Sequence, residues 1–162
     1  MPLVLLRVDE RLIHGQVIVG WAGPLRIECI VVADDDLAAS DWEQDLYQLG
    51  VPAGIQCEFL PLGTARERVA AWQGDSQRVA LLVRGVAELA RLAEGGSLAN
   101  QQVNLGGIHH APGRERVLAY LFLSADERAE LARVAATGAQ VWARDLPDAQ
   151  RVPLAELLTA AN

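Results

Sequence analysis

Residues 3–16 read LVLLRVDERLIHGQ, and the interpretation of the rest of the chain starts from them. The apolar run Leu3–Val8 is typical of a buried strand, and the charged residues after it end that strand. Apolar residues then recur every four positions from Ile13 to Trp21, which predicts a helix that stops at Gly23-Pro24. A strand that leads directly into a helix is the repeating unit of an α/β fold.

The same alternation of apolar runs and amphipathic stretches continues along the chain. Short apolar runs predict six further strands, at residues 27–32, 55–60, 78–83, 102–105, 117–123 and 139–143. Amphipathic stretches predict helices at residues 37–49, 64–72, 86–93, 124–138 and 154–159, with capping boxes at Thr64/Glu67 and Ser124/Glu127. We therefore predict one α/β domain over residues 1–162, with three layers and a mainly parallel central sheet of about seven strands flanked by helices.

Composition narrows the classes of function. The 162 residues include 14 basic and 21 acidic side chains, for a net charge of −7. The basic residues do not cluster, so nucleic acid is not expected as a partner. Cys29 and Cys57 lie in apolar runs without CxxC spacing, which fits reduced thiols in the cytoplasm. No apolar run approaches the roughly 20 residues of a membrane span, so any membrane role must come through a partner.

Ligands of open α/β sheets bind beyond the carboxyl ends of the strands. Three predicted loops lie at that edge, at residues 9–15, 34–36 and 106–113. The first loop has the richest chemistry, because it combines guanidinium groups, a carboxylate and an imidazole where a strand turns into a helix.

These side chains suit the handling of a phosphoryl group. Arg7 and Arg11 can make paired hydrogen bonds to phosphate oxygens, and the backbone N–H groups of a helix start favour an anion. A neutral ring nitrogen of His14 can attack phosphorus while Asp9 or a backbone carbonyl holds the other nitrogen protonated. Gly15 would let the backbone approach a bound phosphate closely. Taken alone, the same residues also fit a surface turn whose exposed ion pairs contribute at most about 1 kcal/mol each.

The segment RVDERLIHGQV, residues 7–17, resembles the phosphorylation-site motif R-(I/V)-D-D-R-L-I-H-G-Q-V. That motif belongs to the IIB components of the mannose/fructose/sorbose family of bacterial sugar phosphotransferase systems. Shared features follow along nearly the whole chain, at Trp21, residues 32–36, VNLGGIHH at residues 103–110, Gly138 and Pro147. The resemblance implies that His14 is phosphorylated, through Nδ1, and that Arg11 stabilises the transferring charge.

The resemblance also implies a place in a relay. His14 would accept a phosphoryl group from a phosphohistidine on a IIA partner and pass it to a sugar held by the membrane subunits IIC and IID. The chain would then be a protein-histidine:sugar phosphotransferase of the cytoplasm, associated peripherally with those subunits. His14 should be accessible and ringed by apolar residues, and no cofactor beyond the transient phosphohistidine is expected. A homo-oligomer stays open.

Other residues are expected around the phosphate. Gln16 completes the motif and should line the site with Arg7, Asp9 and Gly15. Gly106 and Gly107 should let their loop pack against the site, with Asn104 or His109 lining it, although an ordinary surface turn fits equally well. His109 and His110 point in different directions on an extended chain, and no cysteine or carboxylate pair has ligand spacing, so no metal site is predicted.

Two positions depart from the family's pattern. Glu10 replaces the commoner aspartate and is expected to face solvent or to cap the helix. Ala33-Asp34 stands where the family often has Asn-Asp, so Asp34 is either a neighbour of the site or a carboxylate at a helix start.

Two rival functions stay open. In a regulatory module, the same phosphohistidine would signal to a protein partner without sugar transport, and the gene neighbourhood would separate this function from the relay. A phosphate-ester hydrolase that uses His14 as acid or base is the second rival, but the chain shows no second matched catalytic group.

Overall fold

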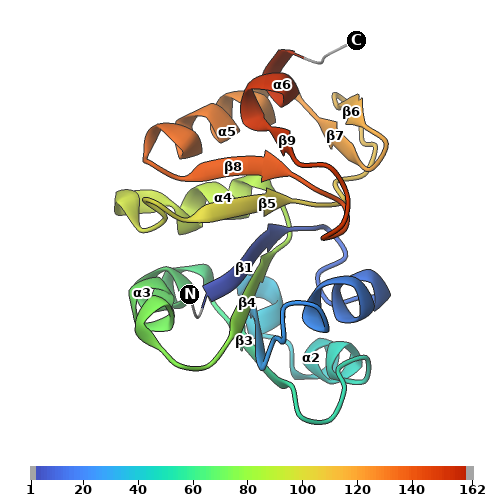
Figure 1. The fold of residues 1–162 in the computed structure, drawn as a ribbon, viewed down its shortest axis with the longest axis vertical. Coiled ribbons are helices and arrows are strands. Elements are labelled where there is room, and N and C mark those ends of the chain that lie inside the picture. Colours follow the sequence, from blue (N-terminus) through green and yellow to red (C-terminus); the bar gives the residue numbers. More distant parts are fainter. Residues whose placement is uncertain (1–2, 160–162) are drawn as a thin grey trace.

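The chain folds around one large sheet. The structure is a computed structural model that describes residues 3–159. The sheet has seven strands in the order β3-β2-β4-β1-β5-β8-β9 (Figure 1). Its strands are β1 (Leu3–Val8), β2 (Cys29–Ala33), β3 (Gln56–Leu60), β4 (Val79–Val83), β5 (Gln102–Leu105), β8 (Gln140–Ala143) and β9 (Val152–Pro153). All neighbouring strands pair in parallel except β9, which runs antiparallel to β8.

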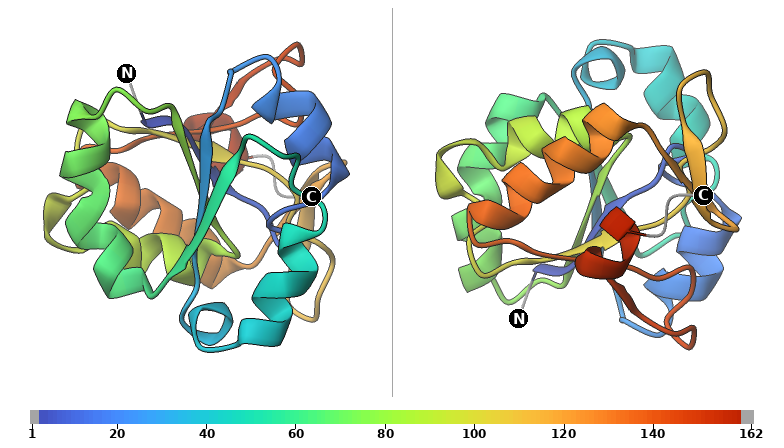
Figure 2. Two further views of the ribbon diagram at one scale, coloured as in Figure 1. Left: turned by 90° about the horizontal axis from the view of Figure 1, so that it is seen from below. Right: turned by 90° about the horizontal axis from the view of Figure 1, so that it is seen from above.

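Helices cover both faces of the sheet (Figure 2). One face packs against α3 (Leu62–Gly74), α4 (Val86–Leu92), α5 (Ala125–Ala136) and α6 (Leu154–Thr159), and a short 3₁₀ turn, η2 (Glu94–Gly96), follows α4. The other face carries η1 (Gln16–Ala22), α1 (Asp35–Ala38) and α2 (Asp41–Gln48). The predicted three-layer α/β architecture with a mostly parallel sheet is confirmed. No helix in the described part of the chain is long and apolar enough to cross a membrane.

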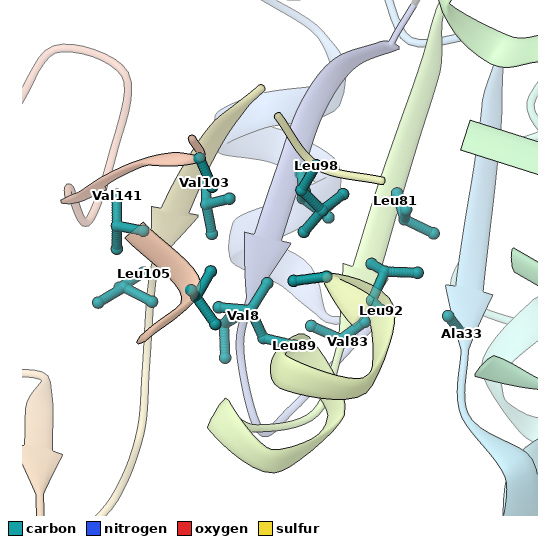
Figure 3. Close-up of a cluster of buried hydrophobic side chains, with 14 of the residues drawn as sticks. Val8, Ala33, Leu81, Val83, Leu89, Leu92, Leu98, Val103, Leu105 and Val141 are labelled. Atoms are coloured by element: carbon teal, nitrogen blue, oxygen red, sulfur yellow. The ribbon is translucent and has the colours of Figure 1, made fainter. Parts of the chain in front are cut away.

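Alternation along the buried strands divides the core into two halves. Val8 and Val83 point toward α4, where they lie beside Leu89 (Figure 3). Leu82, one residue before Val83, belongs to the opposite cluster under η1 and α1. Because side chains of a strand alternate between faces, β2 and β4 contribute to both halves and are apolar throughout.

The predicted strand at residues 117–123 is wrong. This segment belongs to a small antiparallel hairpin of β6 (Glu115–Leu118) and β7 (Leu121–Leu123), outside the main sheet. Residues 119–120 make a tight turn inside what the sequence presents as one apolar run. The seventh strand of the sheet is instead β9, whose Pro153 lacks an N–H and is tolerated at a sheet edge.

Two helix predictions also need correction. The predicted helix at residues 37–49 is two helices, because the chain is extended at Ser40 and the Gln44 side chain binds the carbonyl oxygens of Leu37 and Ala38 at 2.9 and 3.1 Å. The predicted cap at Thr64 is wrong as well. Helix α3 starts two residues earlier, at Leu62, whose N–H donates to the carboxylate of Asp35 at 2.8 Å.

One predicted helix start and one predicted helix end are confirmed. Ser124 and Glu127 form the predicted capping box of α5. The first helix ends before Gly23-Pro24 as predicted, but it begins only at Gln16, so Ile13 lies outside it, and it is a π-helix, a form that is often found at functional sites.

The sheet brings the first loop between two other strand ends. β1 pairs with β4 along its whole length, but with β5 only through Arg7–Asn104 and Val8–Leu105. The backbone N–H of Asp9 continues the ladder by donating to Val83 O at 3.0 Å. Residues 9–15 therefore leave the sheet between the carboxyl ends of β4 and β5.

Candidate functional site

A tight turn shapes the loop that carries His14. The Leu12 N–H donates to the Asp9 carbonyl oxygen at 3.0 Å, and Leu12 has a φ of 55°. This left-handed conformation is rare for a residue other than glycine, and such residues are often found at functional sites. The Leu12 side chain is fully buried, which holds the turn in place.

Asp9 is the centre of the loop's hydrogen bonding. Its buried carboxylate accepts from Arg7 Nη2 at 3.3 Å, from Arg11 Nε and Nη2 at 3.2 Å each, and from the backbone N–H groups of Arg11 and Gly107 at 3.1 and 3.2 Å. Burial, the largest single influence, acts to raise the pKa of Asp9. The hydrogen bonds from Arg11, together with the charge of Arg7, outweigh it and hold the pKa below its ordinary value. Asp9 is therefore a stable anion.

Arg7 supports the loop from beneath. Its guanidinium is fully buried and donates to Asn104 Oδ1 and to the carbonyl oxygens of Arg144 and Asp145, the latter two at 2.8 and 3.2 Å. It also lies 5.0 Å from the centre of the Trp21 ring. Burial lowers the pKa of Arg7, although Asp9 acts in the opposite direction. These contacts fix the orientation of Arg7, and its N–H groups make their hydrogen bonds inside the protein.

The glycines after β5 make room for the two arginines. A Cβ at Gly106 would lie 2.3 Å from Arg7 Nη2, and one at Gly107 would lie 3.1 Å from Arg11 Nη2. Gly15 is different, because a Cβ there would meet nothing within 4 Å and its backbone is helical. The fold thus requires a glycine at Gly106, while Gly15 leaves open space beside His14.

Arg11 is the exposed guanidinium of the loop. Its side chain is 39% exposed, and Asp9 holds it from below. Arg11 Nη2 also donates to Gln16 Oε1 at 3.1 Å, and Gln16 Nε2 donates to Asp145 Oδ1 at 3.1 Å. The guanidinium is therefore oriented at the edge of the sheet, beside His14.

His14 lies against the loop and not out in solvent. Its Nδ1 is 2.9 Å from the Leu12 carbonyl oxygen, and because a carbonyl only accepts, this contact places the proton on Nδ1. Nε2 is buried without a hydrogen-bond partner among the described residues and lies 3.8 Å from Asp9 Oδ2. The side chain is 16% exposed, less than an accessible nucleophile was expected to be. Of the two predicted acceptors the backbone carbonyl is the one in contact, but it contacts Nδ1, the nitrogen expected to be phosphorylated, and not Nε2.

Two other predicted site residues, Asn104 and His109, contact Arg7 and Glu10. Asn104 touches Arg7 but not His14. His109 faces Glu10, with 3.0 Å between Nδ1 and Glu10 Oε2. Glu10 does not cap η1, which corrects that part of the prediction, and its side chain is partly exposed, at 24%. It accepts from the His109 N–H at 3.1 Å and from Arg114 Nη1 at 2.6 Å, because the turn aims it at the loop after β5.

Asp34 lies at the predicted edge of the sheet, where it has a structural role. Its buried carboxylate accepts from the Leu37 N–H at 2.9 Å and so caps α1, and its other oxygen accepts from Arg84 Nε at 3.0 Å. Arg84 follows the last residue of β4 and was not singled out from the sequence. Its position after a strand next to β1 could have identified it.

A second missed element is the loop after β8. Asp145 accepts from Gln16 with its side chain, and from Arg7 and Trp21 with its carbonyl oxygen. A Cβ at Gly20 would lie 2.6 Å from the Leu146 side chain, so this loop packs tightly on η1. No local signal in the sequence around Asp145 marks it, because its partners come from the other end of the chain.

Comparisons with known proteins show which family the chain belongs to. Residues 3–162 match the family model described as the sorbose subfamily IIB component of the phosphotransferase system. The N-acetylgalactosamine-specific phosphotransferase enzyme IIB component 2 of Escherichia coli K12 is 30% identical over 159 residues, which are 98% of this chain and all of that protein. The mannose-specific EIIAB component of E. coli K12 is 30% identical over 117 residues, covering 72% of this chain and 36% of that protein.

Solved structures share the fold over nearly the full length. The crystal structure of manxB from Thermoanaerobacter tengcongensis superimposes with a TM-score of 0.82 at 27% identity, covering 96% of this chain and 94% of that one. The IIBSor domain of the sorbose permease from Klebsiella pneumoniae gives a TM-score of 0.85 at 21% identity, covering 98% and 97%, and shows the fold alone. From the match over residues 3–162 and the full-length relatives, the chain belongs to the sorbose subfamily of phosphotransferase system IIB components.

Proposed function

We propose that the chain is a phosphocarrier that receives a phosphoryl group on His14 from a IIA phosphohistidine and gives it to a sugar bound by the membrane subunits IIC and IID. The observation that carries the proposal is the place of His14 beside the half-exposed guanidinium of Arg11, which the buried carboxylate of Asp9 orients. The family and the mannose-specific relative, whose name joins an A and a B component, support the partners.

The two transfers need alignment and charge neutralisation more than covalent chemistry. In the first, a ring nitrogen of His14 bonds to phosphorus as the bond from phosphorus to the IIA nitrogen breaks. In the second, a sugar hydroxyl oxygen bonds to phosphorus as the bond from phosphorus to His14 breaks, and the hydroxyl proton is balanced by the proton that the released imidazole ring takes up. Arg11 stabilises the charge on the phosphoryl oxygens in both, and Asp9 and Gln16 keep its fork in place.

The ring of His14 has to move for this chemistry. The predicted nucleophile is Nδ1, which in the resting geometry donates to the Leu12 carbonyl oxygen. That hydrogen bond must break before Nδ1 can bond to phosphorus, and the proton must leave this nitrogen or move to Nε2. Rotation of the side chain toward the open space at Gly15 accomplishes the first step, since nothing lies within 4 Å of a Cβ placed there.

The test is phosphorylation followed by intact-protein mass. The chain is incubated with phosphoenolpyruvate, the general phosphotransferase proteins and a cognate IIA, and we expect one acid-labile phosphoryl group on the wild type and none on His14→Ala. His109→Ala is the matched control, because its imidazole faces Glu10, and it should label like the wild type. The assignment of His14 would be overturned if His14→Ala is labelled. It would also be overturned if His109→Ala loses the label while His14→Ala keeps it.

A further inference from the structure

Helix α2 presents an apolar face to solvent beside the His14 loop. Trp42, Leu46 and Leu49 are 66%, 57% and 84% exposed, and α2 buries none of its residues. Positions four and three residues apart lie on one face of a helix, so these three side chains form a single patch. Patches of this kind on a soluble domain indicate contact with another molecule.

The patch borders a hollow of about 480 Å³ that we call the α2 hollow. Its lining consists of Ile13, Trp42, Glu43, Leu46, Tyr47 and Gly50. Ile13 directly precedes His14, so a partner seated in the α2 hollow touches the loop that carries the phosphoryl group. Tyr47 and Ile13 pack against the core beneath η1 and α1, so the base of the hollow is part of the packed core.

The surroundings of the α2 hollow are acidic. Residues 27–65 contain eight acidic side chains and no arginine, lysine or histidine; the acidic residues are Glu28, Asp34, Asp35, Asp36, Asp41, Glu43, Asp45 and Glu58. Three of these are paired, with Arg84, Arg91 and Arg68. Asp36, Asp41, Glu43 and Asp45, all on α1 and α2, make no ion pair with any residue in the range 3–159. The α2 hollow is thus an apolar depression lined by one carboxylate, that of Glu43, with the exposed carboxylates of Asp36, Asp41 and Asp45 on the adjoining helices α1 and α2; we call these four carboxylates the negative rim.

We propose that the α2 hollow docks a basic cytoplasmic loop of the membrane subunits that hold the sugar, with an apolar side chain of that loop inside the hollow. The inference rests on the proposed function and identifies which of its partners uses this surface. Cytoplasmic loops of membrane proteins carry an excess of lysine and arginine, which complements the negative rim. The apolar anchor supplies most of the affinity, while the charges speed the encounter.

The test uses membrane vesicles that contain the cognate IIC and IID, the phosphorylated chain and the sugar. Trp42→Ala and Leu46→Ala should each raise the KM for the phosphorylated chain about tenfold and leave kcat unchanged, because ground-state and transition-state binding are lost equally. Glu43→Gln combined with Asp45→Asn should raise KM less and flatten its dependence on salt. The charge control is Glu67→Gln, which removes an exposed carboxylate from α3 on the opposite layer and should change neither value.

Phosphorylation by phosphoramidate separates this inference from the proposed function, because a small donor requires no docking. Equal labelling of wild type and Trp42→Ala by phosphoramidate, with a raised KM in vesicles, supports the docking surface. An unchanged KM in vesicles overturns it. A defect confined to phosphorylation by IIA would assign the hollow to the donor, and a loss of dimers in sedimentation would assign it to a second copy; either result also overturns the proposal. A wild type that phosphoramidate and IIA both fail to label would instead contradict the proposed function.

Discussion

The two arginines of the His14 loop share the carboxylate of Asp9 but have opposite surroundings. Arg7 is fully buried and donates hydrogen bonds to Asp9, to Asn104 and to two carbonyl oxygens. The Arg11 side chain is 39% exposed and adjoins His14. The difference shows that two arginines four positions apart can have separate roles: the buried one is part of the scaffold, and the exposed one remains available at the edge of the sheet.

The largest effect is expected from Arg7→Met. The substitution leaves Asp9, Asn104 and two carbonyl oxygens without their buried partner, so we expect the free energy of unfolding to fall by about 3–5 kcal/mol. Urea denaturation followed by circular dichroism measures the change. Arg116→Met, at an exposed position, is the control and should cost less than about 0.5 kcal/mol. Equal losses for the two variants would show that Arg7 is not a structural arginine.

The next effect is a pH dependence that involves Asp9. Its folded-state pKa lies below the ordinary value of 3.8, so its contribution to stability is present above that value and is lost as the pH falls through the folded-state pKa. At neutral pH, Asp9→Asn should therefore unfold more easily than the wild type, and the difference in free energy of unfolding should shrink as the pH falls below about 4. A difference that stays constant down to acid denaturation would contradict the account of Asp9 as a buried anion.

A smaller effect is expected from two glycine substitutions. Gly106→Ala places a Cβ within 2.3–2.7 Å of the Arg7 guanidinium, and such overpacking costs about 1–3 kcal/mol. Gly15→Ala meets nothing within 4 Å and has helical backbone angles, so it should change stability by less than about 1 kcal/mol. Thermal unfolding of both variants checks the comparison. If Gly15→Ala proves the more destabilising of the two, the tight approach of Arg7 to Gly106 is not what the fold requires.

The smallest effect on stability is expected from Arg11→Lys. The side chain is partly exposed and keeps its charge, so the free energy of unfolding should change by less than about 1 kcal/mol. The rate of phosphoryl transfer from IIA should nevertheless fall by about tenfold or more, because a lysine cannot keep the paired hydrogen bonds of the guanidinium fork. Rapid-quench measurement gives the rate. An unchanged rate would remove Arg11 from the mechanism and erase its contrast with Arg7.

The sequence could predict the features whose interacting residues are close together along the chain. The first strand, the turn and the first helix are read from neighbouring residues, and Asp9, Arg11 and His14 come together within six positions. The parallel sheet also follows from local patterns. Ser124 and Glu127 mark a helix start because both partners of that cap lie within one turn.

Long-range contacts explain what the sequence could not predict. Asp145 joins the site through Gln16 and Arg7, which lie more than 120 positions away. The break at Ser40 depends on Gln44 reaching back to exposed carbonyl groups, and the hairpin of β6 and β7 depends on a turn hidden in an apolar run. The burial of Arg7 also depends on distant residues, because its guanidinium donates to Asn104 and to the carbonyl oxygens of Arg144 and Asp145.

One measurement tests the central claim most directly. The chain is labelled with ¹⁵N-histidine and phosphorylated through IIA, and the one-bond coupling between ³¹P and ¹⁵N then identifies the phosphorylated nitrogen by NMR. The account predicts a single coupling, to the Nδ1 of His14, with the loss of the Nδ1 proton that meets the Leu12 carbonyl in the resting state. Coupling to a ring nitrogen of His109 or His110, or phosphate without coupling to any histidine, would contradict it.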